Sequence, residues 1–105
     1  MTKNIPLTLA CGDYESIRAL KEGSVTVDGV DLTVLTDMDS ASRHWRMIRG
    51  GEFDIAELSM SSYLMAADRN QPFEAIPVFL HRRFRHGFIF INANAGIKEP
   101  KDLIG

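Results

Sequence analysis

The stretch GEFDIAELSMSSYL, residues 51–64, decides the fold class of this chain. Phe53 and Ile55 begin a strand in its first half, and Glu57 follows on the same side of the pleat. A cluster of serines then precedes an apolar run, and a serine in that position favours the start of a helix. A strand that leads through a short link into a helix is the repeating unit of an α/β fold.

The same alternation extends toward the N-terminus. Residues 5–11 form an apolar run typical of a buried strand, residues 16–22 fit a helix, and residues 30–34 alternate as a half-buried strand does. A hairpin between residues 25–27 and the strand that follows them is an alternative that the spacing leaves open.

The helix before residue 51 is the most clearly marked. Asp39 or Ser40 can cap its first turn, and the glycines at 50–51 end it. The residues spaced for one apolar face are Ala41, Trp45 and Ile48, and those on another face are Arg43, Arg46 and Arg49. We expect Trp45 in the core and His44 at the surface.

The second half of the chain continues the pattern. Residues 63–69 fit a further helix, and residues 75–80 and 88–91 are strand candidates on either side of a basic segment. Residues 94–105 fit a loop and the start of a short helix. The chain is therefore predicted to be α/β, with a mostly parallel sheet and flanking helices.

Composition narrows the class of protein. The 105 residues are 45% hydrophobic and 25% charged, with a formal net charge of −2, which fits one globular domain or part of one. This balance does not predict binding to nucleic acid or to an anionic membrane. The single cysteine, Cys11, excludes an internal disulfide and is expected to be a small buried residue. No spacing resembles a metal site, and the N-terminus is too weakly basic for a secretory signal, so we expect a cytoplasmic protein.

Two motifs follow predicted strands, at the edge where parallel sheets bind their ligands. Asp13 and Tyr14 come after the first strand and are candidate ligand-binding residues. After the third strand, Ser59, Ser61 and Ser62 are candidates to hold a carboxylate through hydroxyls and free helix amides. The alternative is ordinary capping of the helix by one serine.

Two further groups are candidates for chemistry. Glu57 can be a buried acid with a raised pKa that donates a proton, or a carboxylate that caps a helix or pairs with an arginine. The segment HRRFRH, residues 81–86, contains Arg82, Arg83 and Arg85, which can bind carboxylates, and His86, which can move a proton. A solvated loop between strands is the alternative for this segment.

Five stretches resemble the 4,5-dihydroxyphthalate decarboxylase family, whose fold is that of type 2 periplasmic binding proteins. They are LACGDYE, GVDLTVL, GEFDIAELSMSSYL, PVFLHRRFRHGFIFI and GIKEPKDLIG, in the order of the family. The resemblance implies that residues 1–105 are the N-terminal part of the first lobe of a two-lobed substrate-binding fold, without the second lobe. It also implies a connection at residues 24–29 rather than a hairpin. Gly87 and Phe88 depart from the small hydroxyl residues expected there, which leaves the substrate open.

The resemblance implies non-oxidative decarboxylation of 4,5-dihydroxyphthalate to protocatechuate and CO2, in a full-length relative rather than in this chain alone. A solute-binding protein without catalysis is the alternative. His86 or Glu57 would be the proton donor, the three arginines would anchor the retained carboxylate, and the serines would hold the other. No metal or organic cofactor is expected. The expected partners are a small aromatic carboxylate and a second copy of the chain, bound through the incomplete sheet.

Overall fold

The computed structural model describes residues 3–104, and its centre is a three-stranded parallel sheet. The strands β1 (Ile5–Ala10), β2 (Val30–Leu35) and β3 (Ile55–Ala56) lie in the order β2-β1-β3. β1 pairs with β2 along its whole length, whereas β3 joins only at the carboxyl end of β1. The predicted α/β class with a parallel sheet is confirmed.

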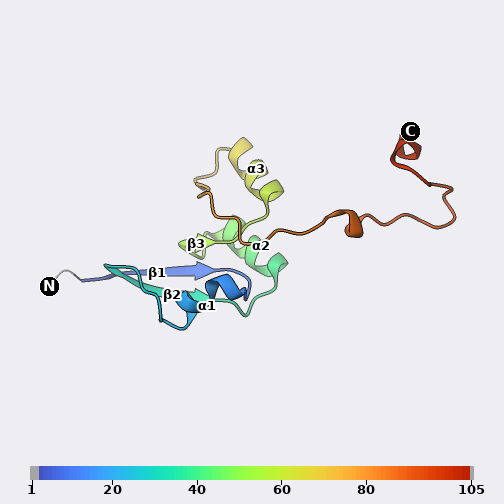
Figure 1. The fold of residues 1–105 in the computed structure, drawn as a ribbon. Helices are drawn as coiled ribbons and strands as arrows, with labels where there is room; N and C mark the ends of the chain where they lie inside the picture. Colours follow the sequence, from blue (N-terminus) through green and yellow to red (C-terminus); the bar gives the residue numbers. More distant parts are fainter. Residues whose placement is uncertain (1–2, 105) are drawn as a thin grey trace.

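The first helical elements flank the sheet, and the last two lie away from it toward the C-terminal end of the described chain (Figure 1). In chain order they are η1 (Glu15–Ile17), α1 (Arg18–Lys21), α2 (Ser40–Gly50), α3 (Met60–Asp68), η2 (His86–Phe88) and η3 (Pro100–Leu103). Residues 24–29 contain no strand and end in a turn closed by a hydrogen bond from Val30 N to Val27 O (3.1 Å). The hairpin alternative is therefore wrong, and the connection implied by the resemblance is confirmed.

β3 is shorter than its alternating pattern predicts, because side chains replace the backbone ladder at its amino end. The Asp54 carboxylate accepts hydrogen bonds from Thr8 N (2.8 Å) and from Thr8 Oγ (2.9 Å). Asp54 N donates in turn to Thr8 Oγ (3.1 Å). Phe53 lies outside the ladder and is buried all the same.

α2 begins and ends as predicted but turns a different face toward the sheet. Asp39 caps it by accepting from Ser42 N (3.0 Å), and Gly51 ends it in the left-handed region. The expectation of a core Trp45 is wrong, since its exposed fraction is 60%. Arg43, placed by its spacing on a polar face, is buried instead because a carboxylate partner lies on that side, as described below.

Because α2 turns its Arg43 side inward, Trp45 and His44 also lie elsewhere than expected. The Trp45 ring lies on the outside of α2, where the guanidinium carbon of Arg49 is 4.5 Å from its centroid. His44 is half-buried rather than at the surface, and its Nε2 has no hydrogen-bond partner among the described residues.

The predicted strands at residues 75–80 and 88–91 are absent, and this prediction is wrong for the described chain. Residues 72–104, here called the arm, first return past β3 and α2 and then run outward from residues 3–71, here called the body (Figure 1). Within the arm only short turns form, such as Val78 N to Ile76 O (2.8 Å) and Phe88 N to Arg85 O (2.9 Å). Because no strand lies alongside, the backbone of these apolar runs finds no ladder to join.

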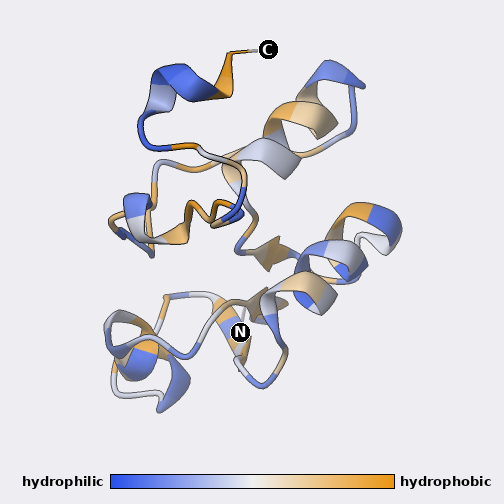
Figure 2. Ribbon diagram, turned by 90° about the vertical axis from the view of Figure 1, so that its right-hand side faces the viewer, coloured by the Kyte–Doolittle hydropathy of each residue, from blue (hydrophilic) through white to orange (hydrophobic). Residues whose placement is uncertain are grey.

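The radius of gyration of the chain and the exposure of apolar residues in the arm both agree with the division into body and arm. The radius of gyration is 18.6 Å, against about 13 Å for a compact domain of this length. Hydrophobic residues, coloured orange in Figure 2, lie on the central strands and again along the arm. In the arm, Phe79, Phe84 and Phe90 are largely exposed. No helix among residues 3–104 is long and apolar enough to cross a membrane.

Candidate functional site

The candidate site lies at the carboxyl ends of β1 and β3, and Glu57 is its centre. Glu57 N donates to Ala10 O (2.8 Å), which extends the ladder one residue past β3 and directs the chain toward the turn after β1. From that turn, Gly12 N donates to Glu57 Oε2 (2.9 Å) and the Tyr14 hydroxyl donates to Glu57 Oε1 (2.7 Å). Tyr14, from the motif predicted after the first strand, is therefore brought into direct contact with Glu57 at the end of the third.

Gly12 leaves room for the Tyr14 ring, which folds back over it, and a side chain at this position would displace the ring. A Cβ added at Gly12 would lie 2.6 Å from Cζ of Tyr14, which is closer than two carbons can approach. Only a residue without a side chain leaves room for the ring. The glycine thus determines where the Tyr14 hydroxyl lies.

Arg43 completes the cluster from the first half of α2. Its Nη2 donates to Glu57 Oε2 (2.8 Å), and its Nη1 donates to Met38 O (3.0 Å). The side chains of Arg43 and Glu57 are only 3% and 17% exposed, so this is a buried ion pair. The sequence analysis anticipated an arginine partner for Glu57 but did not identify Arg43, because a helix pattern assigns arginine to the solvent face.

The cluster fixes the charge of Glu57. Burial alone would raise the pKa of its carboxyl group, but hydrogen bonds from Tyr14 and Gly12 and the charge of Arg43 outweigh burial, and the pKa lies below its ordinary value. The raised pKa expected of a proton donor is therefore not found. Glu57 is an ionised acceptor at neutral pH.

Its two neighbours on the same edge stay protonated. Burial, then the hydrogen bond to Glu57, raises the pKa of Tyr14. Burial, then the charge of Glu57, raises the pKa of Cys11, which is fully buried as expected. At neutral pH the Glu57 carboxylate and the Arg43 guanidinium are charged, and Tyr14 and Cys11 beside them are neutral.

The three serines hydrogen-bond to one another at the start of α3. Ser59 Oγ accepts from Ser62 N (3.2 Å), which makes Ser59 the helix cap. Ser59 Oγ also donates to Ser62 Oγ (2.7 Å) and lies 3.2 Å from Ser61 Oγ. The capping alternative is therefore confirmed, and a role in holding a carboxylate stays a prediction. Asp13 is exposed and pairs with Lys21 (3.0 Å) rather than with the cluster.

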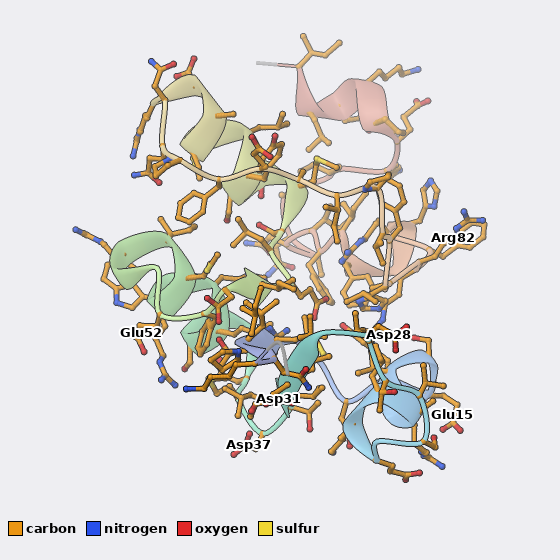
Figure 3. All side chains as sticks on the ribbon, turned by 90° about the vertical axis from the view of Figure 1, so that its left-hand side faces the viewer. Glu15, Asp28, Asp31, Asp37, Glu52 and Arg82 are labelled. Atoms are coloured by element: carbon orange, nitrogen blue, oxygen red, sulfur yellow. The ribbon has the colours of Figure 1, made fainter. Side chains whose placement is uncertain are left out.

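The basic segment meets the site only near its first residues. The ring of His81, a residue that the sequence analysis did not select, lies 5.8 Å from the Tyr14 ring between centroids. Arg83 is close enough for its charge to lower the pKa of Tyr14, although burial keeps that pKa raised. Arg82 points outward, away from the body (Figure 3).

The other two predicted residues of this segment contact the arm itself. The guanidinium carbon of Arg85 lies 5.9 Å from the centroid of the Phe88 ring, and the His86 ring lies 5.6 Å from that of Phe84. Both are exposed. No hydrogen bond or ring contact within residues 3–104 joins either one to Glu57.

An open cavity of about 620 Å³ lies elsewhere, beside the amino end of β3. The end of α2, Phe53 and the start of the arm line it. None of the residues of the Glu57 cluster lines this cavity. Within residues 3–104 no group of three or more histidine, cysteine or acidic side chains is arranged to hold a metal ion.

Comparison with known protein sequences supports the resemblance that the five motifs indicated. No family model matches it. The chain is 40% identical over 102 residues to a Comamonas testosteroni protein named 4,5-dihydroxyphthalate decarboxylase, and 41% identical over 100 residues to a Pseudomonas putida protein of the same name. These matches cover 96% and 94% of the chain but 31% and 38% of the relatives. The chain spans about a third of the length of the curated relatives it matches, and over nearly all of its own length it is related in sequence to 4,5-dihydroxyphthalate decarboxylases, as the five motifs predicted.

Proposed function

We propose that this chain forms part of the substrate site of a non-oxidative decarboxylase that converts 4,5-dihydroxyphthalate to protocatechuate and CO2. The observation that carries the proposal is the 40% identity over 96% of the chain to a protein of that name, a span that includes the Glu57 cluster. The proposal concerns the complete enzyme, because the chain covers 31% of that relative. We propose the cytoplasm as its compartment.

The reaction needs a proton at the ring carbon that bears the departing carboxylate. In 4,5-dihydroxyphthalate one hydroxyl is para to that carbon. When the carbon gains a proton and the hydroxyl loses one, the ring becomes a dienone, whose carbonyl accepts the electron pair released with CO2. The net change is replacement of CO2 by a proton, so the scheme uses no oxidant, metal or organic cofactor.

The proposed roles follow from the charges at the site. His86 is the proposed proton donor in place of Glu57, because Glu57 is held in its ionised form by three hydrogen-bond donors. Arg82, Arg83 and Arg85 are the proposed anchors for the retained carboxylate. Since His86 lies on the arm, this assignment requires the arm to close over the carboxyl edge of the sheet.

The remaining predicted residues complete the proposed pocket wall. Asp13 and Tyr14 would line it from the turn after β1. The hydroxyls of Ser59, Ser61 and Ser62 at the start of α3 would hold the departing carboxylate until it leaves.

A chimera tests this proposal. The chain would replace its matching third of the Comamonas testosteroni relative, and release of CO2 from 4,5-dihydroxyphthalate would be measured against the unaltered relative. Turnover within about tenfold of the control is expected. Ligand binding without CO2 release by a folded chimera would contradict the proposal and favour the solute-binding alternative. His86→Gln in the chimera is expected to lower turnover by about 100-fold or more.

A further inference from the structure

The Glu57 carboxylate retains hydrogen-bonding capacity that the protein does not use. An ionised carboxylate offers about four acceptor positions, two on each oxygen. Gly12 N and Arg43 Nη2 both donate to Oε2, and the Tyr14 hydroxyl donates to Oε1. No further donor to Oε1 is found within residues 3–104, so one position on Oε1 stays open. The side chain is 17% exposed, and it lies at the edge where a ligand would arrive.

The charge of Glu57 decides what can occupy that position. A carboxylate of the ligand would be repelled there, because like charges in contact at a largely buried site are strongly unfavourable. Arg43 donates to Oε2 rather than Oε1, so a ligand carboxylate at the open position would place two carboxylate oxygens in contact with no donor between them. A neutral hydroxyl can donate to Oε1, and a hydrogen bond to a charged acceptor is among the stronger ones in proteins.

The surroundings favour an aromatic hydroxyl. The Tyr14 hydroxyl donates to Oε1, and the ring of His81 lies next to the Tyr14 ring, with centroids 5.8 Å apart and planes inclined at 49°. Such a tilted pair offers ring faces and edges against which another aromatic ring can pack. Of the arginines in the basic segment, Arg83 is close enough to act on Tyr14 through its charge.

We propose that Glu57 Oε1 binds a phenolic hydroxyl of the ligand, so that the hydroxylated side of the ring faces Glu57 and its carboxylates face Arg83. This inference rests on the proposed function, because it assumes an aromatic ligand with both groups. It assigns Glu57 to recognition of hydroxyl groups, which is a different role from that of a proton donor.

The same contact has a consequence for the reaction. When the ring carbon takes a proton from its donor, the hydroxyl proton passes to Glu57 Oε1 and the O–H electron pair forms the carbonyl of the dienone. When the bond to CO2 breaks, its electron pair restores the aromatic ring, the carbonyl pair returns to oxygen, and that oxygen takes the proton back. Glu57 ends unchanged.

NMR titration of the 105-residue chain tests the inference, with the Gly12 amide as reporter because it donates to Glu57 Oε2. The probes are catechol, phthalate and 4,5-dihydroxyphthalate. Catechol and 4,5-dihydroxyphthalate are expected to move the Gly12 signal. Phthalate, which lacks hydroxyls, is expected to leave it in place and to bind about 10- to 100-fold more weakly than 4,5-dihydroxyphthalate.

Three variants make the test specific. Glu57→Gln is expected to abolish the preference for hydroxylated ligands, whereas Glu52→Gln, which alters another arginine-paired glutamate, is expected to keep it. Because Glu57→Gln leaves Arg43 without its carboxylate and can prevent folding, Tyr14→Phe is the second test. It retains the ion pair and vacates a further position on Oε1, so the preference should be at least as large as in the unaltered chain.

Equal binding of phthalate and 4,5-dihydroxyphthalate, absence of binding by all three probes, or loss of the preference in Tyr14→Phe would each overturn the inference. None of these results bears on CO2 release by the chimera. Conversely, an inactive chimera together with a hydroxyl preference in the chain would reject the proposed reaction and leave the hydroxyl site in place.

Discussion

The body and the arm are built from similar residues but differ in what their backbones contact. β1 is an apolar run whose amides and carbonyls pair with β2 along its whole length and with β3 at its end. Residues 88–91 read FIFI, with at least as strong a strand propensity, and remain unpaired and exposed. The comparison shows that an apolar run becomes a strand only where another strand lies within reach.

The body is held together more by polar contacts between its elements than by a large apolar core. Its fully or nearly buried apolar residues are few and mostly small: Ala10, Cys11, Ile17, Phe53 and Ala66. Asp54 joins β1 to β3 at one end through Thr8, and Glu57 joins the turn after β1 to α2 at the other. Matched substitutions in the two regions should therefore have very different effects.

The largest difference is expected between two arginines. Arg43→Met removes the partner of the mostly buried Glu57 and should lower the free energy of unfolding by about 3 to 5 kcal/mol, enough to unfold the body. Arg85→Met, in the exposed arm, should change it by less than about 0.5 kcal/mol. Urea unfolding followed by circular dichroism measures both, and equal effects would contradict the buried pair.

Two glycines give the next contrast. Gly12→Ala places a methyl group against the Tyr14 ring and should lower the free energy of unfolding by about 1 to 3 kcal/mol. Gly87→Ala in the arm meets no atom within 4 Å and should be neutral. A Gly12→Ala chain as stable as the unaltered one would show that Tyr14 does not pack over Gly12.

The stability of the body is expected to depend on pH through His44. Burial, then the charge of Arg43, lowers the pKa of His44, which should thus favour the unfolded state as it gains a proton. Its contribution to stability is present above about pH 6.5 and is lost as pH falls through the lower folded pKa. His44→Gln should reduce the loss of stability between pH 7 and pH 5, and an unchanged loss would show that His44 is not the group responsible. Urea midpoints at both pH values decide between these outcomes.

The smallest effect on stability is expected in the arm itself. Phe90 is 86% exposed, so Phe90→Lys should leave the free energy of unfolding within about 0.5 kcal/mol of its original value. It should nevertheless weaken self-association, because exposed apolar segments with strand propensity promote pairing between copies. Light scattering on a concentration series measures this, and unchanged association would locate the contact elsewhere.

Much of the fold could be predicted because its signals are local. The cap at Asp39, the stop at Gly51 and the apolar run of β1 each depend on neighbouring residues in the sequence. The convergence of Tyr14 and Glu57 could also be predicted, since parallel strands place their carboxyl ends at one edge.

The rest depends on partners distant in sequence. The burial of Arg43 follows from the position of Glu57, fourteen residues away, and no helix pattern contains that information. Trp45 is exposed because Arg43 occupies the inner face of α2. The strands expected at residues 75–80 and 88–91 would need a neighbour that no spacing within those runs can supply.

Hydrogen exchange at the Gly12 amide tests the account most directly. This amide lies outside any strand or helix, and the hydrogen bond that we assign to it is to the largely buried carboxylate of Glu57 (2.9 Å). The account predicts that it exchanges as slowly as amides within β1, while the amides of Phe90 and Ile91 exchange at the rates of an unfolded chain. Rapid exchange at Gly12, or strand-like protection of Phe90 and Ile91, would contradict it.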